Sequence, residues 1–338
     1  MSLIPLDAPR LSFNSSVSLS EQYTDNFHIT ERGRVENFRT SLSASGTATL
    51  NYPNTQGSLT TRLSGAHDSS NDDDSYSFFP SFTGTVQHTF NPRMRLVVSD
   101  SYVRDDDPYL SDSTGLRGER DTFSKNTFSI SFSWLIDIVQ TQVYYRNSFF
   151  FGDEQTMSHI FGATASMPVG ALYAVSGGYE FTTRDTTGDT TGDFSGQTFV
   201  HRVFGSVSRS LGTFTSAGVS SSFSWIDSET DSRIGNISLF AAHGVPGGFS
   251  VSGSVGYSLF DSDRAENPSH RFSASIVASY RFAYATISAG YSQDFRQTAD
   301  EGEDFGIIFS RTAFVAFSYA ITPFVTATAR GQYSESEA

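Results

Sequence analysis

The 338-residue sequence contains no cysteine and a single lysine, Lys125. The absence of cysteine excludes disulfide bonds, thiolate metal sites and cysteine nucleophiles. The formal net charge is −14, and the chain lacks the basic face that a nucleic-acid backbone requires, which excludes nucleic acids as partners. No apolar run approaches the ~20 residues that a membrane-spanning helix needs.

The sequence also opens without a signal-peptide pattern, because residues 1–9 are followed directly by an alternating pattern. We therefore expect it to represent a mature chain or a fragment. Hydrophobic residues make up only 37% of the chain, yet aromatic residues reach 14%. A disordered chain is normally poor in aromatic residues. The composition instead favours strands in which every second residue is serine, threonine or glycine.

Alternation with a period of two runs through most of the chain. In residues 125–134 the apolar positions are Phe128, Ile130, Phe132 and Trp134, with threonine and serine between them. The same pattern covers 38–52, 249–259 and 270–282. A helix, with its period of 3.6, cannot place such a series on one face. Many of these predicted strands reach or exceed the ~9–11 residues that cross a bilayer at a tilt.

Short and long connections alternate between the predicted strands. Tight turns are predicted near 53–54, 91–93, 137, 169–170, 211–212, 245–247, 283 and 321–322. Longer polar segments are predicted at 24–35, 68–74, 104–121, 184–196, 227–232, 261–268 and 295–304. Outer-membrane barrels have short periplasmic turns and longer extracellular loops. The sequence therefore predicts one domain, residues 1–338, folded as a transmembrane up-and-down antiparallel β-barrel of about 16–18 strands with an aqueous lumen.

The alternation predicts about 17 strands, whereas a bacterial single-chain barrel normally has an even number of strands. The last predicted strand covers 324–333, and residues 334–338 have the composition of the start of another outer loop. We therefore expect that one returning strand is missing at the C-terminus. The alternative is that one hairpin was divided or merged in the count.

Aromatic residues gather near the predicted strand ends, where two girdles at the membrane interfaces are expected. The girdle candidates are Tyr52, Trp134, Phe249, Phe282 and Tyr319 near short turns, and Trp225 and Tyr291 near long loops. The alternative is that aromatic residues favour strands at any position.

The charges divide between loops and strands. Most acidic residues fall in the long connections, whereas several arginines occupy the polar phase of strands: Arg39, Arg62, Arg95, Arg146, Arg202, Arg271, Arg281 and Arg330. Lipid would penalise a midplane arginine by ~2–4 kcal/mol, so we predict that these line the lumen, where they can guide anions or acidic sugars. Alternatively, they hold loops or pair with inward carboxylates such as Glu180. Arg311 falls in an apolar series, and a β-bulge near 311–312 would restore the phase.

No specific catalytic constellation is present. Serine is abundant, but no Gly-x-Ser-x-Gly turn occurs, and the histidines lack metal-ligand spacing. Residues 185–193 read DTTGDTTGD and resemble an oxygen-ligand Ca²⁺ loop, yet the spacing and closing glutamate of an EF-hand are absent. A solvated loop is favoured there, with divalent-ion bridges to lipopolysaccharide as a minor hypothesis. We expect no enzyme activity, catalytic residue, metal or cofactor.

One local motif resembles a known family. Residues 20–26 read SEQYTDN and 37–43 read NFRTSLS, followed by the Asn91-Pro92 turn. These segments are similar to the β-barrel porin 2 family. That resemblance implies an outer-membrane barrel, often associated with exopolysaccharide synthesis and export. The chain departs from the family in having no signal peptide, no closing strand and no Pro-Gly after the lead-in to the second strand.

The leading interpretation is a channel or export component of the bacterial outer membrane, which passes a polar solute or a polysaccharide through a water-filled lumen. Its expected partners are the lipid bilayer and lipopolysaccharide, together with a polysaccharide or periplasmic export proteins. The alternatives are a non-transporting scaffold, an adhesin or a sleeve for a partner protein. An outer-membrane enzyme and a soluble β-sandwich or lectin are weaker alternatives.

Overall fold

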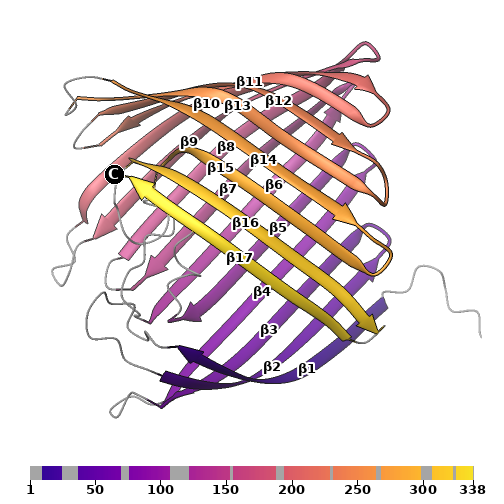
Figure 1. Ribbon diagram of the computed structural model, residues 1–338, viewed down its shortest axis with the longest axis vertical. Coiled ribbons are helices and arrows are strands. Elements are labelled where there is room, and N and C mark those ends of the chain that lie inside the picture. Colours follow the sequence, from indigo (N-terminus) through magenta and orange to yellow (C-terminus); the bar gives the residue numbers. More distant parts are fainter. Residues whose placement is uncertain are drawn as a thin grey trace, which may run out of the picture.

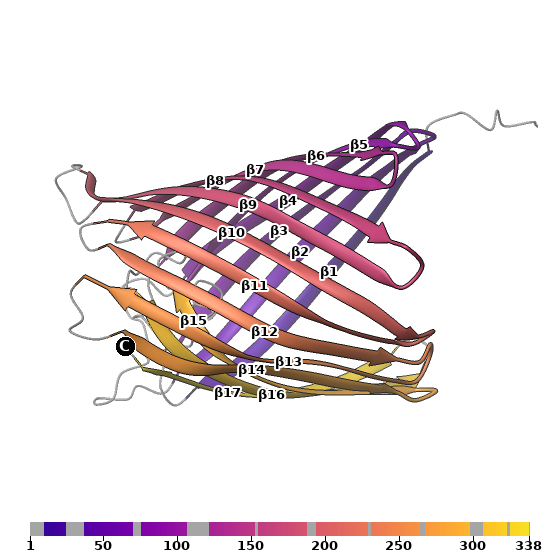
Figure 2. The same ribbon diagram turned by 90° about the horizontal axis from the view of Figure 1, so that it is seen from above.

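One curled antiparallel sheet of 17 strands makes up the computed structural model (Figures 1 and 2). It describes residues 10–24, 37–69, 76–106, 122–152, 155–187, 194–228, 231–263, 268–297, 307–322 and 325–337. The strands are β1 (Arg10–Thr24), β2 (Asn37–Tyr52), β3 (Thr55–Asp68), β4 (Tyr76–Asn91), β5 (Met94–Asp105), β6 (Phe123–Ile136), β7 (Val139–Phe151), β8 (Gln155–Val169), β9 (Tyr173–Thr187), β10 (Phe194–Gly212), β11 (Thr215–Asp227), β12 (Ser232–Gly244), β13 (Phe249–Ser262), β14 (Ser269–Arg281), β15 (Ala285–Gln297), β16 (Ile307–Thr322) and β17 (Val325–Glu337). In these ranges no helix combines the length and apolar character that a membrane span needs.

Each strand pairs with its neighbours in the chain, from β1–β2 through to β16–β17. The predicted up-and-down topology and strand number are therefore confirmed. Among the described residues, β1 and β17 form no pair, so the barrel is not closed. Because the two edge strands run in the same direction, an antiparallel closure needs one further strand between them.

The two faces of the sheet differ as the alternation predicts. On β1, Phe13 and Val17 point to the convex side with 71% and 73% of their surface exposed, whereas Ser16 and Ser18 point to the concave side and bond to serines of β2. The same division continues around the sheet, and large exposed apolar side chains cover its convex side. A soluble monomer rarely exposes so extensive an apolar surface. Hydrocarbon is the solvent that suits this convex face.

The short turns that follow the even-numbered strands lie at one end of the sheet (Figure 1). The connections that follow the odd-numbered strands lie at the other end and are mostly long, the exception being the three residues between β7 and β8. Asp137, Gly170 and Gly247 have φ values of 54°, 65° and 73° in three of the short turns. This left-handed region suits glycine and is tolerated by aspartate, so the residues match the turns that they form. Most of the long connections, including 70–75, 107–121 and 188–193, lie outside the described residues, and so do most of the acidic clusters. Of the predicted Ca²⁺-like loop, residues 185–187 belong to the end of β9, and the rest lies outside the described residues.

Two details of the sequence analysis were wrong. Residues 334–337 do not begin a loop, because they continue β17 and pair with β16. No bulge occurs near Arg311 either, since the register of β15 and β16 is continuous there. Arg311 lies on the convex face, where Glu335, its direct partner on β17, accepts a hydrogen bond of 3.2 Å from its guanidinium.

Candidate solute pathway along the inner wall

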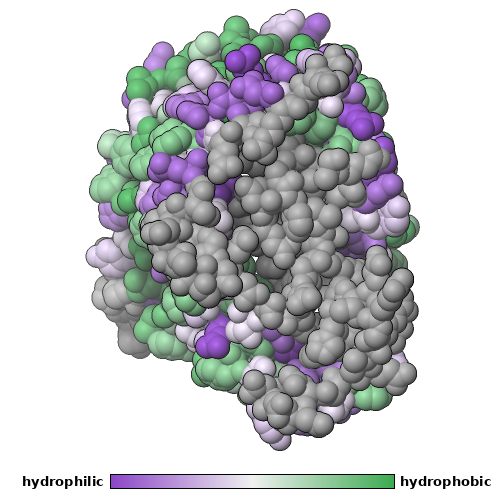
Figure 3. Space-filling view, turned by 90° about the vertical axis from the view of Figure 1, so that its left-hand side faces the viewer, coloured by the Kyte–Doolittle hydropathy of each residue, from purple (hydrophilic) through white to green (hydrophobic). Residues whose placement is uncertain are grey.

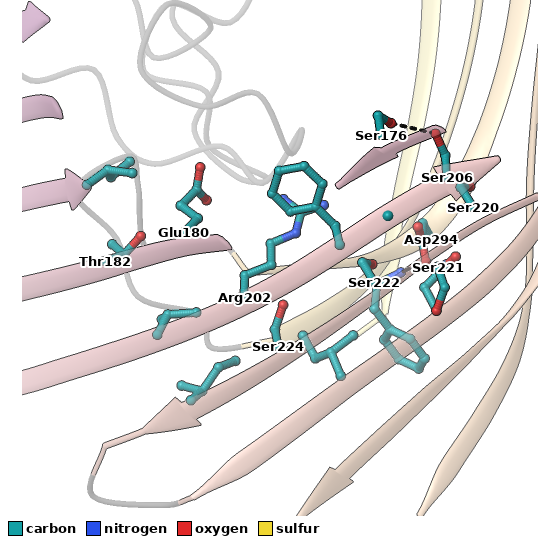
Figure 4. A pocket seen from close by; sticks show the side chains of 18 of the residues that line it. Ser176, Glu180, Thr182, Arg202, Ser206, Ser220, Ser221, Ser222, Ser224 and Asp294 are labelled. Carbon is teal, nitrogen blue, oxygen red and sulfur yellow. Dashed lines mark hydrogen bonds between the residues drawn. The ribbon is translucent and has the colours of Figure 1, made fainter. Parts of the chain in front are cut away.

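The concave side of the sheet forms what we call the inner wall. A cavity of about 550 Å³ on this side is lined by residues from β8 to β12 and also from β15, among them Ser176, Arg202, Ser222 and Asp294 (Figure 4). Because β15 is several strands away along the sheet, these side chains can share a cavity only on the concave side. The residues in phase with them therefore line the interior.

Hydroxyl groups cover much of the inner wall. Serine pairs on adjacent strands bond to each other at 2.7–2.9 Å: Ser16–Ser45, Ser18–Ser43, Ser99–Ser129, Ser176–Ser206, Ser220–Ser238, Ser250–Ser279 and Ser254–Ser275. A hydroxyl carries one donor and two acceptor positions, so a serine in such a pair still has capacity for water or a polar solute. The inner wall thus offers a hydrogen-bonding surface made of small, uncharged groups.

All eight arginines predicted to face inward lie in the inner-wall phase of their strands: Arg39, Arg62, Arg95, Arg146, Arg202, Arg271, Arg281 and Arg330. Among the side chains that the structure describes, three further basic residues share that phase: Arg10, Lys125 and Arg184. The acidic side chains of the described strands in the same phase are Asp68, Asp105, Glu180 and Asp294. The inner wall is therefore more basic than acidic, although the chain as a whole is acidic.

Arg39 is held in a buried network instead of standing free in the lumen. Its guanidinium donates two hydrogen bonds to the Asp106 carboxylate, at 2.8 and 2.9 Å, and Arg39 Nε lies 3.8 Å from Asp68 Oδ1. Asn37 donates a 2.7 Å hydrogen bond to Asp68, and the Phe79 ring lies 5.2 Å from the guanidinium. The network ties β2 and β3 to the segment that follows β5. For this residue the structure supports the alternative reading, in which arginine holds a connection.

Arg202, in contrast, is exposed on the wall of the cavity (Figure 4). It is the direct cross-strand partner of Glu180, and its guanidinium lies 5.5 Å from the centre of the Phe204 ring. Glu180 accepts a 2.7 Å hydrogen bond from the Tyr144 hydroxyl. This part of the wall therefore combines a cation, an aromatic ring and a carboxylate. The cation can bind anions, and the carboxylate can accept hydrogen bonds from hydroxyl-rich molecules.

Four aromatic side chains of the inner wall lie across glycines on the neighbouring strand. The pairs are Tyr144 with Gly162, Phe204 with Gly178, Phe240 with Gly218 and Phe314 with Gly290, and each is a direct cross-strand pair. A Cβ added at Gly178 would stand 2.6 Å from Phe204 Cζ, and one at Gly218 would stand 2.5 Å from Phe240 Cζ. Each ring therefore occupies the space of the missing side chain and lies over the neighbouring strand.

The alternation does not predict these rings, because they stand at its polar positions. In each pair an aromatic residue takes a position where the alternation predicts a polar one, and a glycine lies opposite it on the neighbouring strand. This pairing can be recognised only when the strand register is known. Lys125 and Arg184 were also missed, although extending the alternation through β6 and β9 would have placed both on the inner wall.

The girdle candidates all lie in the convex phase or in an adjoining turn. Tyr52, Trp134, Phe249, Phe282 and Tyr319 lie near short turns, and Trp225 lies near the opposite end of β11. Tyr291 differs from its predicted position, because it lies at the centre of β15, which extends to Gln297 before the long connection. Its hydroxyl donates a hydrogen bond to Gln293. Around the barrel, hydrophobic residues are visible at the edge of the end view in Figure 3.

The six histidines on described strands also take the convex phase: His67, His88, His159, His201, His243 and His270. Several bond to a hydroxyl at 2.7–2.8 Å, as in His159 with Tyr145 and His201 with Tyr179. They are spread over separate strands, and the described residues contain no group of three or more acidic or histidine side chains arranged to hold a metal ion.

A curled up-and-down sheet with an apolar convex face and a polar inner wall defines a class: the chain is a bacterial outer-membrane β-barrel. Several solved structures share the fold. Three of them are the FrpB iron transporter from Neisseria meningitidis, F3-3 variant (TM-score 0.59, 11% identity), the siderophore receptor PirA from Pseudomonas aeruginosa (TM-score 0.54, 9% identity) and the alcaligin outer-membrane receptor FauA from Bordetella pertussis (TM-score 0.52, 11% identity).

The similarity covers nearly all of this chain but not all of those receptors. It spans 98%, 99% and 98% of the chain, and 63%, 68% and 62% of FrpB, PirA and FauA, respectively. At this level of identity the likeness shows the fold alone. No protein-family model matches the sequence, and no curated protein matches it.

Proposed function

We propose that the chain forms an outer-membrane channel that passes a polar solute or a polysaccharide and prefers anionic groups. The observation that carries this proposal is the composition of the inner wall, where bonded serine pairs and arginines line strands whose other face is apolar. A barrel of 16–18 strands is wide enough for an aqueous channel, and rings of basic side chains favour anions.

The aromatic rings of the inner wall extend the proposal to saccharides. These rings are part-exposed on the inner wall, and a sugar can stack on an aromatic face while its hydroxyls bond to nearby polar groups. Arg202 and Glu180 stand beside two of these rings, Phe204 and Tyr144. The resemblance of residues 20–26 to the β-barrel porin 2 family supports the same direction, and membership of that family is part of the proposal.

Planar-bilayer recording with the full chain tests the proposal. We expect discrete ion currents and a reversal potential displaced toward that of chloride in a KCl gradient. Arg202→Glu should displace the reversal potential toward that of potassium, whereas Arg209→Glu on the convex face should not. Absence of current in a correctly folded preparation would contradict a channel, and a cation preference in the unchanged protein would contradict the anion preference.

A non-transporting scaffold or sleeve is the second candidate, and one observation favours it. Phe123 and Ile226 lie on the inner wall near the long-connection end, and each has only 4% of its surface exposed. Apolar side chains packed at that level narrow the outer end of the lumen. Folded protein that gives no current would favour the scaffold. Periplasmic export proteins and lipopolysaccharide are the partners that we propose for either function.

A further inference from the structure

A groove on the convex face crosses strands β11 to β14. Ala217, Ala241 and Gly253 form its floor and are consecutive cross-strand partners. Larger side chains border this floor on both sides: Val219, Leu239 and Val255 on one side, and Thr215, His243 and Val251 on the other. The hollow has a volume of about 930 Å³, and its lining is mainly apolar.

The two ends of the groove differ in chemistry. Arg209, the direct partner of Ala217, stands at one end, near the short turn that follows β10. It is exposed, and its guanidinium lies 5.5 Å from the centre of the Tyr173 ring. On the same side, the Thr215 hydroxyl and His243 Nδ1 are 2.8 Å apart. Ile276 and Tyr291 close the other end.

The direction of the groove follows from the sheet geometry. A line of direct partners runs perpendicular to the strands, and barrel strands are tilted by roughly 35–45°. The groove therefore rises obliquely from the short-turn end, where Arg209 lies, toward the middle of the membrane near Tyr291. This places a cation at headgroup level and an apolar hollow at the level of acyl chains.

We propose that this groove binds one anionic phospholipid of the periplasmic leaflet, with the phosphate at Arg209 and an acyl chain over Ala217, Ala241 and Gly253. Basic pockets at a membrane surface bind anionic headgroups, and a hollow lined by apolar groups with a few polar ones is typical of a ligand site. The binding site is independent of whether the lumen conducts.

A second copy of the chain fits this surface less well. Another barrel in the same membrane presents its strands at the same height, so Arg209 would need a carboxylate at the short-turn end of the partner's strands. On the described strands, the convex-facing carboxylates lie instead toward the long-connection end or near mid-height: Glu21, Asp100, Asp185, Asp227, Asp261 and Glu335. At the short-turn end Asp137 is exposed, but it stands in the turn between β6 and β7, past the end of the strands. A phospholipid phosphate supplies a negative charge at the level of Arg209 itself.

Native mass spectrometry of the full chain, after release from nanodiscs of equal parts phosphatidylglycerol and phosphatidylcholine, tests the proposal. We expect the protein to retain one phosphatidylglycerol and to prefer it over phosphatidylcholine by about fivefold. A preference of this size is what one basic residue near an anionic membrane surface contributes. Arg209→Gln should abolish the preference. Ala241→Leu should fill the groove floor and remove the retained lipid, with heat-modifiable gel mobility used to verify folding.

Two matched variants act as controls. Ala44→Leu places the same larger side chain on the convex face of β2. Arg104→Gln removes a convex arginine at the long-connection end of β5, away from the short-turn end where Arg209 lies. Both should retain phosphatidylglycerol as the unchanged protein does. The proposal is overturned if the unchanged protein retains no lipid, if Ala241→Leu and Ala44→Leu retain equal amounts, or if the protein is a dimer that Ala241→Leu dissociates.

Discussion

Tyr144 lies across Gly162, its direct cross-strand partner, so closely that a side chain at position 162 would collide with the phenol ring. The Tyr144 hydroxyl continues over the next strand and donates a hydrogen bond to Glu180. One ring thereby spans three strands of the inner wall, β7, β8 and β9. A glycine in a strand interior normally weakens the strand, and here the ring supplies the packing that the glycine lacks.

Gly162→Ala should lower the stability of the barrel, because the added Cβ must displace the Tyr144 ring and its bond to Glu180. We expect a loss of about 1–3 kcal/mol, the usual cost of overpacking. Urea unfolding in lipid vesicles measures this loss. Gly331→Ala is the matched control, since no atom lies within 4 Å of a Cβ at that position. Equal stability of the two variants would contradict the packing described for Tyr144.

Arg39→Met should destabilise the barrel strongly, because it leaves the Asp68 and Asp106 carboxylates in a buried site without their cation. Removing one partner of a buried ion pair costs about 3–5 kcal/mol. Asp106→Asn in the same background should restore part of the loss, and a double-mutant cycle of unfolding free energies measures the coupling. Arg330→Met, at an exposed inner-wall position, serves as the control. Additive effects of Arg39→Met and Asp106→Asn would contradict a direct pair.

The register of β16 and β17 is continuous from Phe309 to Ala320, and it predicts a specific cross-link. Ala313 and Tyr333 are direct partners, so the double variant Ala313→Cys, Tyr333→Cys should form a disulfide on mild oxidation. Ala313→Cys with Gln332→Cys should not, because Gln332 points to the opposite face. The chain has no cysteine of its own, so gel mobility with and without reductant reports only the introduced pair. A cross-link in the second variant alone would place a bulge where the structure has none.

Glu335→Gln should have a small effect on stability, even though Arg311 then loses its partner. The two side chains are partly exposed, at 31% and 46%, and exposed ion pairs contribute about 0–1 kcal/mol. Unfolding of Glu335→Gln in lipid vesicles measures the change. A loss above about 2 kcal/mol would show that the pair is enclosed by lipid instead of lying at the membrane surface.

Period-two alternation was sufficient to predict the barrel, because a side chain's phase fixes the face on which it lies. The same rule predicts Arg62, Arg95 and Arg146 on the inner wall, and the register of β3, β5 and β7 places them there. It failed at Ser334, where a strand continues through polar residues because they face the interior or pair across the sheet.

Contacts that depend on three-dimensional placement could not be predicted. The bond from Arg39 to Asp106 joins residues 67 positions apart, and nothing in either local sequence marks the pair. The lipid groove arises because Ala217, Ala241 and Gly253 fall into register, and each is unremarkable in its own strand. Register is the information that the sequence pattern lacks, since alternation fixes the face of a residue but not its neighbour.

The opposite environments of Ser131 and Phe132, adjacent residues on β6, test the central claim most directly. Single cysteines at these positions can be labelled in the reconstituted barrel with a membrane-impermeant thiol reagent, on a background without native cysteine. The account predicts rapid labelling at Ser131→Cys, which faces the aqueous interior, and none at Phe132→Cys, which faces hydrocarbon. Equal labelling of the two, or labelling at Phe132→Cys alone, would contradict the assignment of the two faces.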